Sequence, residues 1–140
     1  AGFRTLRFGF ETSDAGRQVK TGGKVTNDHL TNALSSLTKA GYAPRDIGLY
    51  LLCGLPDQDA REVEESIRFV HSLGARPVLA EFSPIPGTAL WEKAVATSAY
   101  NIAHEPLYHN NTLLPCRHER FTYEDYRRLK SLLQPEGGTP

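Results

Sequence analysis

The chain has 140 residues, which is room for one ordinary domain and not two. Sixteen lysines and arginines balance sixteen aspartates and glutamates, so no bulk positive field points to nucleic acid or to anionic lipid. Hydrophobic residues make up 39% of the chain, which is enough for a core and excludes wholesale disorder.

Cysteine and methionine usage bears on the setting of the protein. Two cysteines are too few for a disulfide-stapled secreted scaffold, and the longest apolar runs are too short to span a membrane. We therefore expect a cytoplasmic protein with no membrane partner. The chain contains no methionine. Either an initiator methionine has been removed or, as we expect, the chain is a piece of a larger protein.

The first half of the chain alternates between strand and helix patterns. Residues 4–11 alternate with a period of two, which predicts a strand, and a polar, glycine-containing stretch follows. Apolar residues at helical spacing over 30–37 predict a helix that ends at Gly41. Residues 46–53 are almost all apolar, which is typical of a strand covered on both faces.

The same pattern repeats once more. Asp59 and Glu62 form a start that resembles a capping box, and this second helix is expected to end at Gly74. Residues 76–83 predict a third strand, and residues 88–96 predict a short third helix. Parallel strands require such crossovers, and their right-handedness leaves a rolling barrel or an open α/β sheet.

The remaining residues depart from this layout. Residues that follow the third helix are rich in Asn, His and Pro and predict a long loop, after which Thr122 and Asp125 predict the start of a last helix. The predicted organisation is a βα region over residues 1–98, a loop segment over 99–121, a terminal helix over 122–134 and a tail over 135–140.

Strand alternation also predicts which side chains face inward. Arg7, Tyr50 and Glu81, together with Glu11, are expected on the less apolar face, where they would line a lumen or a cleft. Buried charges are costly unless they are paired or bound to a ligand, so we take Arg7, Tyr50 and Glu81 as candidate substrate contacts. Alternatively, Arg7 and Glu81 form an ion pair or lie on a solvated edge.

Ligands of α/β folds bind beyond the carboxyl ends of the strands. In this chain those ends are residues 11–13, 54–56 and 83–88, and each carries glycine, proline or small hydroxyl residues that allow a ligand to approach the backbone.

These strand ends resemble the second half of a radical S-adenosylmethionine (SAM) barrel, of the Fe–S oxidoreductase group that has cobalamin-binding neighbours. The stretch Gly9-Phe10-Glu11-Thr12 is similar to the family's G-[LIV]-E-[ST], and Gly54-Leu55-Pro56 is similar to its G-L-P turn. Ser83 to Thr88 matches its S-P-x-P-G-T, and Lys24 matches a basic residue in the loop after the first of these strands. Gln58 stands where the family has an acidic residue.

The resemblance covers residues 3–96 and implies a fold, a cofactor and a reaction. The fold is a partial TIM-like (βα) barrel of α/β class, with about three parallel βα units and an added C-terminal helix. The whole enzyme would cleave SAM at a [4Fe–4S] cluster to a 5′-deoxyadenosyl radical, which abstracts hydrogen from an unknown substrate. The implied SAM-binding residues are Glu11, Thr12, Lys24, Leu52, Gly54, Ser83, Pro84 and Ile85.

The cluster motif of the family, Cys-x3-Cys-x2-Cys, is absent from this chain, and Cys53 and Cys116 lie far apart in sequence. We therefore expect the cluster ligands in a missing N-terminal half of the barrel, which would be the main partner, with a cobalamin-binding domain as a further candidate. No catalytic residue and no metal ligand is predicted in this chain, and the isolated chain is expected to be inactive.

The loop over residues 99–121 contains three histidines and Cys116, but their spacing matches no compact zinc site. Loop packing is the expected role of these side chains. Because the loop could close over the strand ends, His109 and Asn110 are candidate substrate contacts.

Two other functions stay open: a non-catalytic α/β binding module, and part of a SAM-independent barrel lyase. An aldolase-like lyase would place a catalytic lysine within a strand, and none of the three predicted strands has one. A sheet cut from a barrel has open edges, so we also expect the chain to self-associate.

Overall fold

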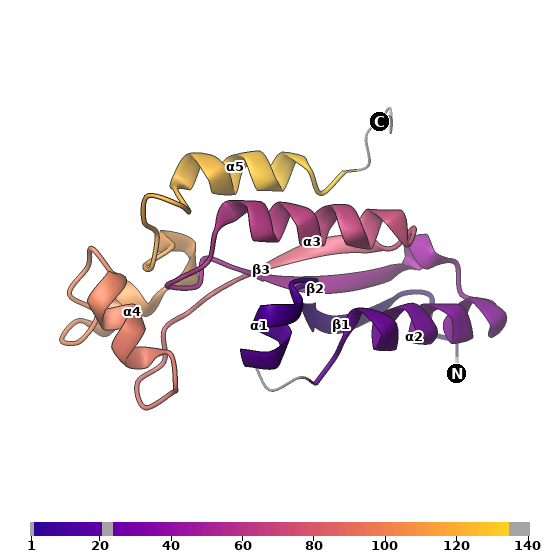
Figure 1. The fold of residues 1–140 in the computed structure, drawn as a ribbon, viewed down its shortest axis with the longest axis horizontal. Helices are drawn as coiled ribbons and strands as arrows, with labels where there is room; N and C mark the ends of the chain where they lie inside the picture. Colours follow the sequence, from indigo (N-terminus) through magenta and orange to yellow (C-terminus); the bar gives the residue numbers. More distant parts are fainter. Residues whose placement is uncertain (1, 21–23, 135–140) are drawn as a thin grey trace.

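The computed structural model describes residues 2–20 and 24–134, so the predicted tail over 135–140 lies outside the described residues. Short 3₁₀ turns occur at Pro44–Asp46, Pro106–His109 and Asn111–Leu113. The strands and α-helices are, in chain order, β1 (Leu6–Glu11), α1 (Ala15–Lys20), α2 (Asn27–Lys39), β2 (Ile47–Cys53), α3 (Ala60–Ser72), β3 (Arg76–Glu81), α4 (Trp91–Thr97) and α5 (Tyr123–Ser131) (Figure 1).

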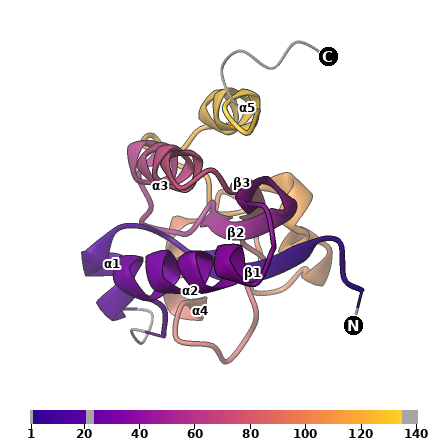
Figure 2. The same ribbon diagram turned by 90° about the vertical axis from the view of Figure 1, so that its right-hand side faces the viewer.

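The three strands form one parallel sheet in the order β1-β2-β3. Sequential order, with the connecting helices packed on one side, is the winding of a (βα) barrel, whereas a doubly wound sheet reverses its order and carries helices on both faces. In Figure 2, α2 and α3 lie on one side of the strands, and α5 lies next to α3 at the β3 edge of the sheet. The predicted α/β class with three parallel βα units is confirmed.

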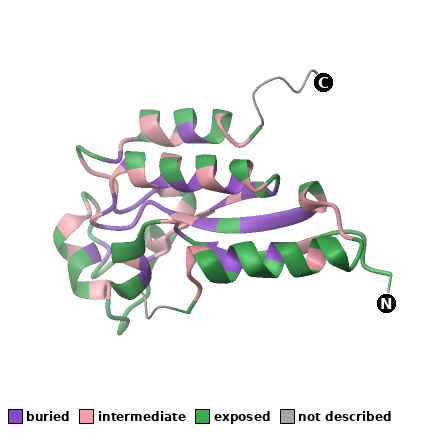
Figure 3. Ribbon diagram, turned by 45° about the vertical axis from the view of Figure 1, so that its right-hand side comes forward, coloured by how far each residue is buried: buried purple, intermediate pink, exposed green. Residues whose placement is uncertain are grey.

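The core lies between the sheet and these helices. Ile47, Leu49, Leu51 and Cys53 alternate along β2 and are fully buried against α2 and α3 (Figure 3). On the opposite face Tyr50 is 37% exposed. The prediction that β2 is covered on both faces is therefore wrong for this chain, because helices cover only one side of the sheet.

Arg7 and Tyr50 share this uncovered face, as predicted, and an Arg7 nitrogen donates a hydrogen bond to the Tyr50 hydroxyl at 3.3 Å. Glu81 does not join them. It is in register with Cys53 and so lies on the covered face, where its carboxylate accepts a hydrogen bond from the Tyr126 hydroxyl of α5. The prediction for Glu81 is wrong because alternation along β3 places it with Pro77 and Leu79.

Side chains fix the starts of the helices. At α5 the Thr122 hydroxyl accepts from the Asp125 N–H at 3.1 Å, while the Asp125 carboxylate accepts from the Thr122 N–H at 3.0 Å, so the predicted start is confirmed. At α3 Asp59 is the N-cap, but Glu62 does not complete a capping box. Glu62 instead binds Arg17, from a part of the chain that was expected to be loop.

Helix α1 was not predicted, because it is short and mostly polar and has no apolar periodicity. Helix α4 begins at Trp91, later than expected, because residues 85–88 form a turn in which the Thr88 hydroxyl donates to the Ile85 carbonyl at 2.8 Å. No helix in the described ranges is both long and apolar enough to cross a membrane.

The loop segment after α4 packs around a small second core. Ala94, Ile102 and Cys116 are buried there, with Phe82 and Trp91 packed against them. The predicted loop is therefore an ordered part of the fold, and it lies against the carboxyl ends of the strands.

Core packing by α3 can be tested by truncation. Ile67 is fully buried between α3 and the sheet, so we expect Ile67→Ala to lower the free energy of unfolding by about 2–5 kcal/mol. Val19→Ala, at an exposed position of α1, is the control and should change it by about 0.5 kcal/mol or less. Urea unfolding followed by circular dichroism measures both, and equal effects would contradict the packing described.

Candidate functional site

A cleft of about 1140 Å³ opens at the carboxyl ends of the three strands. Such edges hold the ligand sites of parallel α/β folds. The cleft is lined by residues from the end of β1, from α1, from the α1–α2 connection, from the β2–α3 and β3–α4 loops and from α4. These residues are Glu11, Arg17, Lys20, Lys24, Leu55, Asp57, Phe82, Ser83, Ile85, Thr88, Ala89, Leu90 and Lys93.

The end of β1 is a strained turn. Pairing with β2 shifts register between Gly9 and Glu11, and Glu11 has a φ of +73°. A left-handed conformation is costly for a residue with a side chain and concentrates at functional sites. Glu11 therefore leaves the alternation of β1 and lines the cleft instead of standing beside Arg7.

Buried polar contacts hold the turn that follows Glu11. The Gln18 amide of α1 donates to the Thr12 carbonyl at 2.8 Å, and Ser66 of α3 accepts from the Ser13 N–H at 2.9 Å. Thr12 is itself buried, and its hydroxyl lies 3.4 Å from both the Ser66 hydroxyl and the Glu62 carboxylate. Thr12, which the family resemblance implies as a SAM contact, is thus not among the residues that line the cleft, and it holds the turn beside Glu11 in place.

An ionic network forms one wall. Arg17 of α1 donates to Glu62 of α3 at 2.9 Å and to Asp57 of the β2–α3 loop at 3.0 Å. The Arg17 side chain is only 11% exposed. Lys93 of α4 binds the other oxygen of Asp57 at 2.6 Å. Asp57 therefore joins α1 to α4 across the cleft wall.

These two cations keep Asp57 charged to lower pH than an ordinary aspartate. Its partial burial alone would raise the pKa, but the hydrogen bonds from Lys93 and Arg17 outweigh that effect and lower the pKa of Asp57 to about 2. Asp57 and Glu62 thus hold Arg17 in one position, as charge-assisted bonds to a fork-shaped guanidinium do.

The turn after β2 uses backbone geometry and one buried amide. Gly54 has a φ of +80°, which glycine adopts without strain. Gln58 is buried and donates to the Leu52 carbonyl at 3.0 Å, while its oxygen accepts from the Leu55 N–H at 3.3 Å. An ionised glutamate could not donate the first bond. The departure from the family pattern at Gln58 is therefore compatible with a structural role in this turn.

The end of β3 is tied to the loop segment. The Ser83 hydroxyl donates to the His109 carbonyl. The His109 ring contacts Trp91 edge-on, with ring centroids 5.4 Å apart, and its Nε2 is 2.7 Å from the Ile102 carbonyl. Asn110 caps the next turn by accepting from the Thr112 N–H at 3.0 Å. His109 and Asn110 thus serve the packing of the loop and are not among the residues that line the cleft.

The structure brings together half of the residues implied for SAM. Glu11, Lys24, Ser83 and Ile85 line the cleft. Three more lie behind its surface or on the uncovered face of the sheet: Gly54 and Pro84 are buried, and Leu52 is half-buried.

Sequence reasoning missed the four charged residues Arg17, Lys20, Asp57 and Lys93. No motif assigned a role to them, and Arg17 and Lys20 lie on the helix that was not predicted. Their one shared signal is nearness in sequence to the strand ends, which many surface charges also have.

The described residues contain no group of three or more His, Cys, Asp or Glu side chains that could hold a metal ion. Burial, with a smaller contribution from the Glu81 charge, raises the pKa of Cys53 to about 12, and burial raises the pKa of Cys116 to about 11. Cys53 is buried in the main core and Cys116 in the second core, so the two thiols do not belong to one common site.

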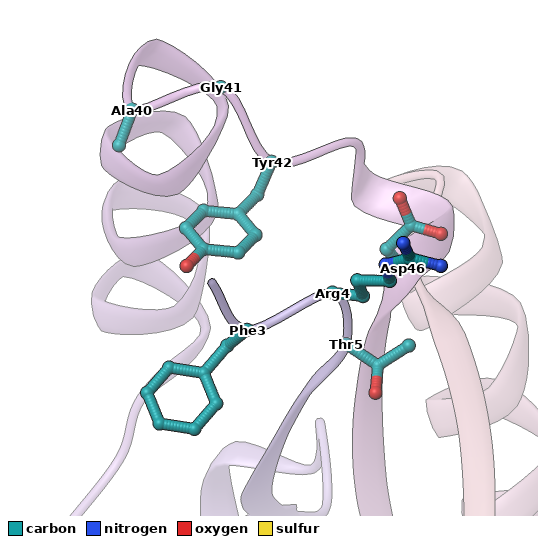
Figure 4. Close-up of a pocket in the computed structure, with 7 residues that line it drawn as sticks. All are labelled: Phe3, Arg4, Thr5, Ala40, Gly41, Tyr42 and Asp46. Atoms are coloured by element: carbon teal, nitrogen blue, oxygen red, sulfur yellow. The ribbon is translucent and has the colours of Figure 1, made fainter. Parts of the chain in front are cut away.

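A second cavity, of about 510 Å³, lies at the opposite end of the sheet (Figure 4). It is formed where Thr5 precedes β1 and Asp46 precedes β2, and Phe3 and Tyr42 flank it. Because the amino-terminal ends of parallel strands rarely carry the ligand site, the cleft at the carboxyl ends is the candidate functional site.

No protein-family model matches the chain. The chain is similar to a protein of Pyrococcus horikoshii that is described as an uncharacterized methyltransferase, with 31% identity over 100 residues. The match covers 69% of this chain and 21% of the relative, so the chain spans about a fifth of that protein's length.

The ion pairs of Asp57 predict a pH dependence. Because the folded pKa of about 2 lies below the ordinary value of 3.8, the stabilisation is complete above the ordinary pKa and is lost as pH falls through the folded pKa. The free energy of unfolding should therefore fall less between pH 4 and pH 2 in Asp57→Asn than in the unmodified chain. Asp28→Asn, at an exposed position of α2, should keep the full dependence.

The buried thiols make a second prediction. At pH 8 neither Cys53 nor Cys116 should react with Ellman's reagent in the folded chain, because both pKa values lie well above that pH and both side chains are buried. In guanidinium chloride both should react at once. Rapid labelling of either thiol under native conditions would contradict its placement.

Proposed function

We propose that this chain is the SAM-binding half of a radical SAM domain, and that SAM lies in the cleft at the carboxyl ends of β1, β2 and β3. One observation carries this proposal: Glu11, Lys24, Ser83 and Ile85 come from three separate parts of the chain and line one cleft. These are residues to which the family resemblance assigns SAM contacts.

The chemistry of the lining suits the parts of SAM. Lys24 offers an ammonium to the carboxylate of the amino acid moiety, and Glu11 offers acceptors to the ribose hydroxyls. Leu55, Phe82 and Ile85 provide apolar surface for the adenine ring. Bound SAM would supply the activated carbon–sulfur bonds that the reaction breaks.

The chain's own residues would orient this ligand. Arg17 is held by Asp57 and Glu62, and the Gln18 bond to Thr12 holds the turn beside Glu11. A cleft whose walls are fixed before binding loses little conformational entropy when the ligand enters.

A [4Fe–4S] cluster does not fit the described part of this chain, because it needs at least three thiolates and the two cysteines are buried in separate cores. In the proposal, the cluster ligands come from an N-terminal half of the barrel. The isolated chain would then bind SAM without cleaving it.

The reaction of the whole protein is part of the same proposal. Hydrogen abstraction by a SAM-derived radical is the family's chemistry, and the similar protein of Pyrococcus horikoshii is described as a methyltransferase. That description favours methyl transfer to the substrate as the net reaction, with the methyl group coming from a second molecule of SAM, because the molecule cleaved to the radical leaves its methyl group on methionine.

SAM binding to the isolated chain tests the proposal. We expect SAM to shift the amide NMR signals of residues that line the cleft, and Lys24→Gln to weaken binding about 10- to 100-fold, since a hydrogen bond between charged groups contributes about 1.5–3 kcal/mol. Lys39→Gln, at the far end of α2 and outside the cleft, should bind as the unmodified chain does.

Two results would contradict the proposal. One is the absence of any SAM-dependent shift around the cleft in a chain that is folded by circular dichroism. The other is equal SAM affinity of the unmodified chain and Lys24→Gln, combined with shifts elsewhere on the molecule.

A further inference from the structure

The cleft has more cationic side chains than the single carboxylate of SAM can bind. Four cationic side chains line it, namely Arg17, Lys20, Lys24 and Lys93, against two carboxylates, Glu11 and Asp57. Ligand sites tend to have a charge that complements the ligand. SAM has one carboxylate, one ammonium and one sulfonium, so it is itself a cation at neutral pH.

Ion pairs with Asp57 and Glu62 neutralise only some of the cationic side chains of the cleft. Arg17 is bound by Asp57 and Glu62, and Asp57 also binds Lys93. Among the described residues no carboxylate lies within ion-pairing distance of Lys20 or Lys24. If Lys24 receives the carboxylate of SAM, Lys20 is left at the cleft with no anion.

Lys93 lines the same cleft as Lys20 and keeps hydrogen-bond donors that Asp57 does not occupy. Its side chain is 51% exposed, and its contact with Asp57 at 2.6 Å needs one of the three N–H groups of an ammonium. Lys20 ends α1, and Asp57 joins α1 to α4 through Arg17 and Lys93. The two lysines therefore stand on walls that one carboxylate connects.

The size of the cleft fits a second ligand. Pockets for single small molecules typically measure about 300–1,000 Å³, and this cleft measures about 1140 Å³. The charge and the size agree that SAM would not be the sole occupant.

We propose that the substrate sharing this cleft with SAM is anionic, and that Lys20 and Lys93 bind its phosphate or carboxylate group. This inference rests on the proposed function, because it assigns Lys24 to SAM. Lys20 and Lys93 are then specificity-determining residues: they select substrates with an anionic group and position that group at the α1 and α4 side of the cleft.

The test is an NMR titration of the chain, saturated with SAM, with inorganic phosphate and separately with acetate at constant ionic strength. At least one anion should shift the amide signals around Lys20 and Lys93. Lys20→Gln and Lys93→Gln should each raise its Kd several-fold, and Lys39→Gln should leave the Kd unchanged. Because Lys93→Gln also removes a contact of Asp57, circular dichroism must show that the variant is folded, and Lys20→Gln provides the result independent of that contact.

The outcomes separate the two proposals. An anion that displaces SAM, with an affinity that depends on Lys24 and not on Lys20, overturns the second site and leaves SAM binding intact. The second site is also overturned if Lys20→Gln, Lys93→Gln and the control Lys39→Gln bind the anion with equal affinity, or if neither anion shifts any signal. Phosphate or acetate binding that depends on Lys20, in a chain that does not bind SAM, contradicts the proposed function and supports the anion site.

Discussion

The burial of every second side chain of β2 is the constraint on which the other features depend. Ile47, Leu49, Leu51 and Cys53 have no contact with water, and full burial of a side chain such as leucine or isoleucine stabilises a fold by about 1.5–3 kcal/mol. The helices that bury them lie on one side and connect successive strands as crossovers, so β1, β2 and β3 run parallel and end at the same edge. The cleft forms at that edge because the three following turns meet there.

Polar contacts then determine how rigid each wall of the cleft is. Arg17, Asp57 and Glu62 form a part-buried network between α1, the β2–α3 loop and α3, and the resulting ion pairs leave little freedom to the groups involved. Lys20 and Lys24 stand at the same cleft with exposed side chains. The wall held by ion pairs is suited to position an organic ligand, and the exposed lysines beside it can adjust to an anionic group. This combination links the proposed SAM site to the proposed anionic substrate.

The strands and the larger helices were predictable because each buries a periodic apolar stripe. The start of α5 was predictable because Thr122 and Asp125 interact within one turn. Helix α1 was not, because six mostly polar residues show no such stripe and are held by contacts with α3. Glu81 was assigned to the wrong face because the helices cover the face of β3 that it shares with Pro77 and Leu79, and alternation alone does not show which face is covered.

The sequence by itself determined the α/β order, the position of the strand ends and the residues Glu11, Lys24, Ser83 and Ile85 as site candidates. The order and the strand ends follow from local periodicity, and the four site candidates follow from the resemblance of short motifs to those of a radical SAM domain. Only the tertiary structure decided which charges surround the cleft. The bond from Arg17 to Glu62 joins residues 45 positions apart, and the bond from Lys93 to Asp57 joins residues 36 positions apart. Such pairs depend on how successive βα units stack, and no local pattern in the chain records that distance.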